Sequence, residues 1–179
     1  MSSPYEDSII IFNISLAILS FPLYIYVVSD INETKGINMK TLYTAHVTAR
    51  GGRNGEVKSH DGVINLETRT PKEMGGEGGL YTNPEQLFAA TYSACYEGAL
   101  GFVAKNEGVE LNGSTITAHV SFDSAGFGDF NISVKLDVEL PGIEEQTALK
   151  LIEKAHLTCP YSKAINGNVP VKTELIRNA

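Results

Sequence analysis

The chain has 179 residues, of which 42% are hydrophobic and 20% are charged, with a formal net charge of -7. This length and composition suit one soluble domain with its own core. The acidic balance and the lack of any Lys or Arg run argue against a nucleic-acid-binding protein, because a polyanion requires clustered cations. The two cysteines are too few for the disulfide framework of a small secreted module, which leaves redox chemistry, metal binding or inert burial as their roles.

Residues 1–38 differ in composition from the rest of the chain. Within them, residues 8–28 form an uncharged apolar stretch that is just long enough to span a bilayer. An acidic flank and the lack of a small-residue cleavage site argue against a signal peptide, and Pro22 argues against a regular transmembrane helix. We expect an apolar leader or a non-native N-terminal extension over residues 1–38, a functional domain over residues 39–179, and no role for a membrane. If the stretch did insert, the lysines after it would leave the domain in the cytoplasm.

The domain opens with a predicted β-hairpin. Residues 42–49 predict a strand, and Asn54-Gly55 predicts the turn that leads into strands at residues 56–59 and 62–66. This arrangement places Arg53 at the tip of the hairpin.

A long helix follows a glycine-rich run at residues 75–79. The run lacks the Gly-Lys-Ser/Thr ending of a phosphate-binding loop and follows no strand, so it predicts a flexible loop. Asn83 is a helix cap, with Pro84 in the first turn and Gln86 three residues after the cap, and we expect the helix to run to about Lys105. Small side chains along it indicate a buried central helix that another helix can approach closely: Ala89, Ala90, Ser93, Ala94, Gly98, Ala99 and Gly101.

The C-terminal half predicts a sheet and a second helix. Residues 115–122 and 131–140 alternate between apolar and polar side chains, which predicts an antiparallel pair. Residues 143–156 show one apolar helical face that ends just before the second cysteine, and residues 169–176 predict a final strand. The order of these elements indicates an α+β domain.

Several motifs together resemble the Ohr/OsmC family, and its Ohr branch in particular. The resemblance covers residues 39–176 in order and leaves the first 38 residues unmatched. It rests on Gly51-Gly52-Arg53, Asn83-Pro84-Glu85-Gln86-Leu87-Phe88-Ala89-Ala90, Ala94-Cys95, Gly98-Ala99-Leu100 and Cys159-Pro160-Tyr161-Ser162.

The resemblance implies an organic hydroperoxide reductase. In such an enzyme Cys95 would be the peroxidatic thiol that forms a sulfenic acid, and Cys159 the resolving thiol that closes a Cys95-Cys159 disulfide. Arg53 and Glu85 would tune the thiolate. The implied fold is an intertwined homodimer, with antiparallel sheets packed around a long central helix. The implied reductant is the dihydrolipoyl group of a lipoylated protein, or dihydrolipoamide, with no bound cofactor or metal and a cytoplasmic location.

The chemistry of a peroxidase adds a constraint on Cys95. This residue lies twelve positions after the cap Asn83, where the helix dipole has largely faded. A thiol of pKa ~8.5 is about 3% ionised at pH 7, so complete ionisation accelerates attack by at most roughly thirtyfold. A donor must also stabilise the alkoxide that leaves as the O–O bond breaks. Arg53 is the natural candidate, with Glu85 holding its guanidinium in place.

Helix geometry separates Glu85 from Cys95. Ten residues on one straight helix correspond to about 15 Å along the axis. If both residues serve one centre, we predict that one comes from the other subunit of a dimer, or that the helix is broken between them. The small-residue face of the helix favours the dimer.

Other roles remain open for the same residues. A cysteine on such a helix is by itself more often inert than nucleophilic, and Arg53 at a hairpin tip is by default a solvated charge. His156 with Cys159 suggests half of a metal site, but the other histidines are scattered and zinc is improbable. Phe127 and Phe130 lie on a glycine-flanked loop that could wall an apolar substrate pocket.

Two other functions compete with the Ohr reading. One is a peroxidase of the sister OsmC branch, against which Gln86-Leu87-Phe88 and the residues after Cys95 argue. The other is a thiol redox sensor that signals through a partner, for which the sequence offers no DNA-binding element. Turnover with a dithiol reductant would separate an enzyme from a sensor.

Overall fold

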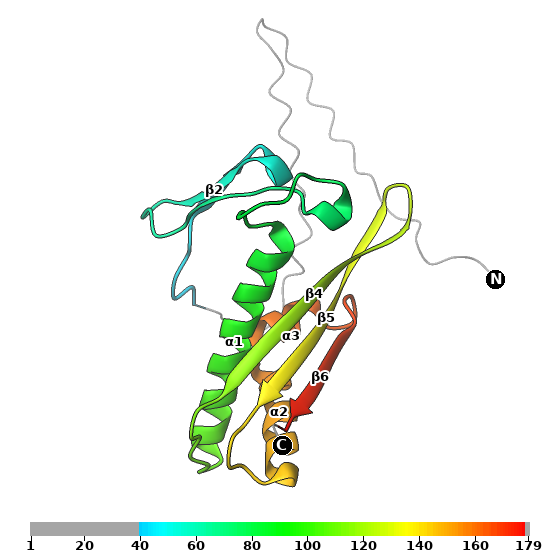
Figure 1. Cartoon of the computed structure of the whole chain (residues 1–179). Helices are drawn as coiled ribbons and strands as arrows, with labels where there is room; N and C mark the ends of the chain where they lie inside the picture. The colour runs from blue at the N-terminus through cyan, green and yellow to red at the C-terminus, as the bar shows by residue number, and fades with distance from the viewer. Residues whose placement is uncertain (1–39, 178–179) are drawn as a thin grey trace, which may run out of the picture. The chain divides into compact units, whose positions relative to one another are not determined.

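The helix that carries Cys95 begins and ends close to the predicted positions (Figure 1). α1 (Pro84–Asn106) is capped by Asn83, whose side-chain oxygen accepts a hydrogen bond from the backbone N–H of Gln86 at 2.8 Å. This bond satisfies one of the donors that the first turn leaves unpaired. The structure is a computed structural model that describes residues 40–177, so the apolar stretch at residues 8–28 lies outside the described residues.

Residues from Tyr43 onward form one compact unit of mixed α and β structure. Besides α1, its elements in chain order are β1 (Val47–Arg50), the 3-10 turn η1 (Gly52–Asn54), β2 (Glu56–Ser59), β3 (Asn65–Glu67), the 3-10 turn η2 (Lys72–Met74), β4 (Thr115–Gly126), β5 (Asp129–Glu139), α2 (Glu145–Thr158), α3 (Pro160–Ile165) and β6 (Val171–Ile176). The α+β class is therefore confirmed. None of the helices within residues 40–177 is long and apolar enough to cross a membrane.

The predicted hairpin is present in a three-stranded antiparallel sheet of order β1-β2-β3. β1 starts at Val47 rather than at residue 42, and β3 starts at Asn65 because Gly62 turns the chain with a φ of 77°. The sheet has an apolar face that the described chain leaves largely uncovered, since Val47 is 51% exposed and Leu66 43% exposed.

The second sheet has the order β4-β5-β6 and is mixed rather than antiparallel. β4 and β5 pair antiparallel as predicted, with Val120 opposite Val134. β6 pairs parallel to β5, which corrects the expectation of purely antiparallel sheets. The reason is the connection: α2 and α3 lie between β5 and β6 in the chain and form a crossover that returns β6 in the same direction.

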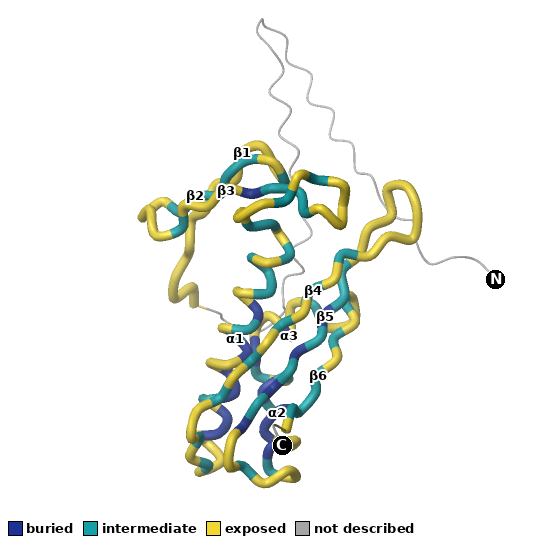
Figure 2. The backbone as a smooth tube through the Cα atoms, viewed as in Figure 1, coloured by how far each residue is buried: buried dark blue, intermediate teal, exposed yellow. Residues whose placement is uncertain are grey.

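The core lies where α1, β5 and α2 meet, as the buried segments in Figure 2 show. α1 contributes large side chains to it, among them Tyr92, Tyr96 and Leu100. Its small residues do not all face inward, since Ala90 and Ala94 are exposed. The prediction of a buried central helix therefore holds for one face of α1 and fails for the other within this chain.

α3 is an element that the sequence analysis did not predict. The sequence predicts a helix that ends just before Cys159, and α2 does end at Thr158. Proline also suits the first position of a helix, where its missing N–H costs nothing, and here it starts α3. Cys159 is consequently the single residue between two helices.

Candidate active site

The two cysteines lie side by side although 64 positions separate them in the chain. Cys95 is in the middle of α1 and Cys159 is at the α2–α3 corner, and their Sγ atoms are 3.7 Å apart as free thiols. A disulfide bond requires about 2.05 Å, so the sulfurs need to approach by about 1.7 Å. The distance between the two Sγ atoms, which cannot be read from the sequence, is therefore short enough for a pair of redox-active thiols.

The α2–α3 corner fixes the position of Cys159. Its backbone N–H donates to the carbonyl of Ala155 at 2.8 Å, and its carbonyl accepts from the backbone N–H of Lys163 at 3.1 Å. The Cys159 side chain is fully buried, whereas Cys95 is half-buried. Cys95 is therefore the more accessible of the two thiols, as a thiol that meets the substrate first must be.

The surroundings of Cys95 disfavour its thiolate within one chain. Burial raises the pKa of the Cys95 thiol, and the contact with Cys159 raises it further. A hydrogen bond from the backbone of Tyr161 acts in the opposite direction. No basic side chain of residues 40–177 is among the groups that set this pKa. A peroxidatic cysteine needs a lowered pKa instead. A positive charge near Cys95 would supply that shift, and the described part of the chain does not provide one.

Arg53 and Glu85 form a two-pronged ion pair. Nη1 and Nη2 of Arg53 donate to the two carboxylate oxygens of Glu85 at 2.8 and 2.6 Å. The pairing raises the pKa of Arg53 and lowers the pKa of Glu85, in each case mainly through the shared hydrogen bonds. The Arg53 guanidinium also lies 4.7 Å from the centre of the Phe122 ring. Arg53 is therefore not the solvated charge that a hairpin tip suggests by default.

The hairpin tip that carries Arg53 is anchored by Thr68, a residue that the sequence analysis missed. The Thr68 hydroxyl donates to the carbonyl of Gly52 at 2.8 Å and accepts from the backbone N–H of Gly55 at 3.1 Å. The Thr68 side chain is buried. A lone threonine after a short strand gives no sequence signal for this role, because its partners lie 13 and 16 positions away.

Within one chain the two pairs stay apart. α1 runs unbroken from Pro84 to Asn106, so Glu85 in its first turn and Cys95 are about 15 Å apart along the axis. Of the two predicted solutions, a broken helix is wrong. The other solution, in which a second subunit supplies one of the pairs, stays a prediction.

Aromatic side chains line the strand ends next to Arg53. Phe122 on β4 and Phe130 on β5 stack with ring centres 5.1 Å apart. Phe127, in the turn between these strands, is fully exposed, and Phe130 is 56% exposed. Phe127 therefore lies on a surface loop as predicted, whereas Phe130 is in β5 and not on the loop. Phe122, which the sequence analysis did not single out, connects Phe130 to the guanidinium.

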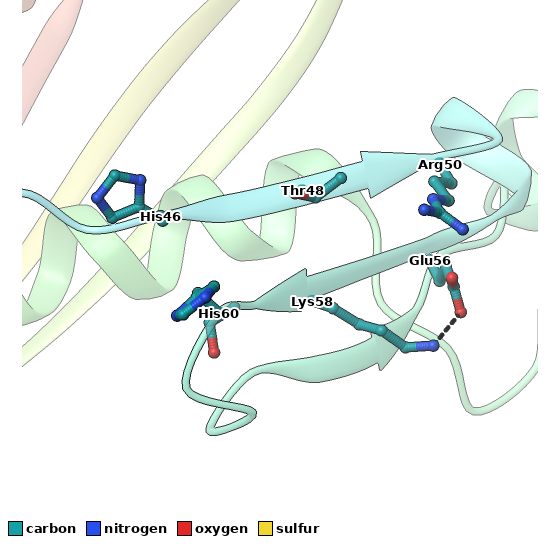
Figure 3. A pocket seen from close by; sticks show the side chains of 7 residues that line it. His46, Thr48, Arg50, Glu56, Lys58 and His60 are labelled. Carbon is teal, nitrogen blue, oxygen red and sulfur yellow. Dashed lines mark ion pairs between the residues drawn. The ribbon is translucent and has the colours of Figure 1, made fainter.

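A hollow on the polar face of the N-terminal sheet lies elsewhere (Figure 3). It contains no thiol and neither member of the Arg53–Glu85 pair. Its lining includes an ion pair between Lys58 and Glu56 at 2.6 Å.

His156, the predicted half of a metal site, has a buried Nδ1 without a hydrogen-bond partner. In the part of the chain that the structure describes, no three metal-ligating side chains gather around it or elsewhere.

Comparison with known proteins agrees with the geometry. The sequence signature of the family described as OsmC-like protein matches residues 75–174. The chain is 45% identical over 141 residues to the organic hydroperoxide resistance protein of Xanthomonas axonopodis pv. citri, covering 76% of this chain and 96% of that one. It is 47% identical over 135 residues to the organic hydroperoxide resistance protein OhrB of Bacillus subtilis, covering 75% and 98%.

A solved structure gives the same result. The crystal structure of an organic hydroperoxide resistance protein from Elizabethkingia anophelis superposes with a TM-score of 0.73 at 48% identity, covering 78% of this chain and all of that one. These three relatives, at 45–48% identity, are all named for organic hydroperoxide resistance. The chain therefore belongs to the OsmC/Ohr family, and within it to the organic hydroperoxide resistance branch.

Proposed function

We propose that this protein is a thiol-dependent peroxidase that reduces organic hydroperoxides to alcohols. The observation that carries the proposal is the pair of free thiols 3.7 Å apart, one accessible and one buried. The names of the relatives, which refer to organic hydroperoxide resistance, supply the substrate class.

The first step is oxidation of Cys95. Its thiolate attacks the outer peroxide oxygen, the O–O bond breaks, and the sulfur becomes a sulfenic acid. The leaving alkoxide takes a proton and departs as an alcohol. A guanidinium next to this oxygen stabilises the charge that develops on it, which is the role proposed for Arg53.

The second step closes a disulfide. The Cys159 thiolate attacks the sulfur of the Cys95 sulfenic acid, and the hydroxyl group leaves as water after taking up a proton. The buried position of Cys159 protects it from the peroxide while leaving its sulfur in reach of Cys95. A dithiol then reduces the disulfide through a mixed disulfide and becomes oxidised itself.

The proposed donor of the positive charge is Arg53 of the partner subunit in a homodimer. An antiparallel crossing of two α1 helices near Ala90 brings the first turn of one, with its Arg53–Glu85 pair, level with the partner's Cys95, because residues 85 and 95 are equidistant from residue 90. Such a crossing would place a guanidinium near the thiol whose pKa is raised within one chain.

Uncovered surfaces of the chain support this dimer. Ala90, Ala94 and Gly98 are exposed along one side of α1, and a Cβ added at Gly98 would meet no atom within 4 Å. Small side chains allow two helices to approach closely. The apolar face of the N-terminal sheet is likewise open, with Val47 and Leu66 about half exposed. The second copy would cover both surfaces.

The aromatic side chains next to Arg53 favour bulky apolar peroxides. Phe122, Phe127 and Phe130 would contact the organic group of the substrate while the guanidinium contacts its oxygens. Hydrogen peroxide offers nothing for this surface to bind. The proposed reductant is a lipoyl dithiol, carried by a protein or free as dihydrolipoamide, and the proposed location is the cytoplasm, where thiols are kept reduced.

Steady-state turnover of the full chain tests the proposal. Reduction of tert-butyl hydroperoxide and of hydrogen peroxide is measured with dihydrolipoamide and with thioredoxin. Turnover that favours the organic peroxide and dihydrolipoamide is the expected result. A single oxidation without turnover with either reductant would contradict it and indicate a redox sensor.

Two cysteine variants assign the roles of the thiols. Cys95→Ser is expected to abolish sulfenic acid formation. Cys159→Ser is expected to allow one oxidation and then to stall with Cys95 as a sulfenic acid, which dimedone traps for mass spectrometry. Trapping at position 159 in the Cys95→Ser protein would reverse the assignment.

A further inference from the structure

Tyr92 and Ser162 form a second link between the two segments that carry the thiols. A hydrogen bond joins the Tyr92 hydroxyl and Ser162 Oγ at 2.8 Å, and the two side chains are 0% and 1% exposed. Building on the peroxidase function proposed above, we propose that this bond is a positioning device that holds Cys159 against Cys95 and sets the rate at which the Cys95 sulfenic acid becomes a disulfide.

The link runs beside the thiol pair. Tyr92 lies three residues before Cys95 on α1, so both side chains project from neighbouring turns of the same helix. Ser162 lies three residues after Cys159, which caps the N-terminus of α3. The hydrogen bond and the thiol contact therefore connect the same two segments, about one helical turn apart.

α3 is attached through Ser162 and through Ile165, which packs half-buried against the core. It has six residues, and Ser162 is its one buried residue. Its first-turn bond, from the N–H of Lys163 to the carbonyl of Cys159, ties any movement of α3 to the cysteine. If Ser162 loses its partner, α3 can pivot about the single residue that joins it to α2, and that residue is Cys159.

Tyr92 is a rigid anchor for this attachment. Its ring packs edge-on against Phe88 and Tyr96, with ring centres 6.0 and 6.3 Å apart. Burial raises the pKa of Tyr92, the hydrogen bond with Ser162 lowers it, and negative charge on Cys159 or Cys95 raises it. The Tyr92 hydroxyl therefore stays protonated at neutral pH and remains a neutral hydrogen-bond partner of Ser162.

The position of Cys159 decides the fate of the oxidised Cys95. The sulfenic acid either loses water to the Cys159 thiolate and forms the disulfide, or reacts with a second hydroperoxide molecule. In the second reaction the peroxide gives one oxygen to the sulfur, which becomes a sulfinic acid, and leaves as the alcohol. Thiols do not reduce the sulfinic acid. Slower formation of the disulfide therefore leads to faster irreversible loss of the Cys95 thiol.

Three variants of the full chain test the proposal. Tyr92→Phe and Ser162→Ala each remove the hydrogen bond. Tyr96→Phe is the matched control, because Tyr96 is an equally buried tyrosine on the same helix whose hydroxyl donates to the carbonyl of Ile152 at 2.8 Å, away from α3. Each protein is mixed with tert-butyl hydroperoxide and quenched, and its sulfenic acid, disulfide and sulfinic acid are quantified by mass spectrometry.

The two test variants are expected to oxidise Cys95 at the wild-type rate within about twofold and to form the disulfide about fivefold to tenfold more slowly, as the loss of one buried hydrogen bond implies. Their fraction of sulfinic acid rises in proportion as the peroxide is increased. Tyr96→Phe is expected to match the wild-type protein in both steps. The double variant Tyr92→Phe/Ser162→Ala is expected to be no slower than either single variant, because both remove the same bond.

Two results would overturn the positioning role. One is a Tyr92→Phe protein that resolves its sulfenic acid as fast as Tyr96→Phe. The other is a double variant whose effect is the product of the two single effects, since the residues would then act independently. Failure of the proposed function gives a different result, in which the wild-type protein itself forms neither the sulfenic acid nor the disulfide. If Ser162→Ala does not fold, the comparison of Tyr92→Phe with Tyr96→Phe still tests the proposal.

Discussion

At the scale of single residues, the geometry of Arg53 matters as much as its charge. Its planar guanidinium donates through two nitrogens to Glu85 and lies over the Phe122 ring. A lysine in its place would keep the charge but not the two-pronged contact or the stacking. The Arg53 side chain is therefore held in one orientation by groups on two different segments, Glu85 on α1 and Phe122 on β4.

The first prediction concerns Arg53→Ala and Arg53→Lys. We expect Arg53→Ala to slow the oxidation of Cys95 by more than thirtyfold, because ionisation of the thiol alone accounts for at most about that factor. Arg53→Lys is expected to fall between it and the wild type. Single-turnover rates with tert-butyl hydroperoxide measure this, with Arg50→Ala, an exposed arginine at the end of β1, as the control. A loss smaller than thirtyfold would reduce Arg53 to a device that only lowers the pKa of Cys95.

The second prediction concerns the pH dependence of stability. Arg53 holds the pKa of Glu85 below its usual value, so the folded state binds this proton less readily than the unfolded state. The stabilisation is complete above the unfolded pKa of about 4.3 and is lost as pH falls through the lower, folded value. The difference in free energy of unfolding between the wild type and Glu85→Gln should therefore be constant above about pH 5 and shrink below about pH 4.

Urea unfolding from pH 7 to pH 3 measures that difference. Glu110→Gln, at an exposed position, serves as the control and is expected to change the free energy of unfolding by less than about 0.5 kcal/mol at each pH. A Glu85→Gln difference that does not change with pH would show that the ion pair contributes nothing to the fold.

Motifs in the sequence could name Arg53, Glu85 and both cysteines but not their neighbours. The partner of Arg53 lies 32 positions away, and the link between Tyr92 and Ser162 spans 70. Distances across such spans depend on how the elements pack, which local patterns do not encode. No local pattern therefore indicates that the Tyr92 hydroxyl has a specific buried partner.

At the scale of elements, the hairpin between β1 and β2 is the support of the Arg53 side chain. Its tip closes tightly at Gly55, where a Cβ would lie 1.8 Å from the carbonyl oxygen of Arg50. The obstacle to a side chain at Gly55 is therefore contact with the backbone of Arg50 at the end of β1.

The third prediction compares Gly55→Ala with Gly62→Ala. Gly55→Ala must move the tip and with it Arg53, so we expect a loss of stability and a slower oxidation of Cys95. Gly62 lies in the next turn, where no atom lies within 4 Å of an added Cβ. Alanine at its φ of 77° lowers the free energy of unfolding by about 1 kcal/mol. Gly62→Ala is expected to lower the melting temperature without changing the rate. Equal rates for the two variants would contradict the supporting role of the hairpin.

Element types were predictable from sequence where the pattern was long, but the direction of β6 and the short helix α3 were not. α1 shows both a cap and a full run of helical residues, and it was placed within one residue at its end. β6 was predicted as a strand, but its parallel direction depends on the crossover through α2 and α3. α3 was missed because Pro160 fits both a helix end and a helix start.

At the scale of the whole molecule, the fourth prediction concerns the second subunit. Ala90→Arg inserts a long charged side chain into the exposed small-residue side of α1, so we expect it to dissociate the proposed dimer. The pKa of Cys95 should then rise above its ordinary range, as burial within one chain dictates, and peroxidase activity should fall. Sedimentation and the absorbance of the thiolate against pH measure both effects.

Gln146→Arg is the control for this experiment. It adds the same charge at an exposed position on α2 and is expected to leave the dimer and the pKa of Cys95 unchanged. An Ala90→Arg protein that remains dimeric and fully active would show that this side of α1 is not the interface. The sequence indicates the proposed interface in two ways, through the spacing of Glu85 and Cys95 and through the small residues along the helix.

The unbroken length of α1 has a genetic consequence. If the two reactive groups of each centre come from different copies, an Arg53→Ala chain and a Cys95→Ser chain, each inactive alone, should complement one another when mixed. Random reassortment makes half of the dimers mixed, and each of these has one centre with both groups intact, so about a quarter of the wild-type activity should return. Because α1 keeps Glu85 and Cys95 of one chain apart, two inactive variants would together restore part of the activity.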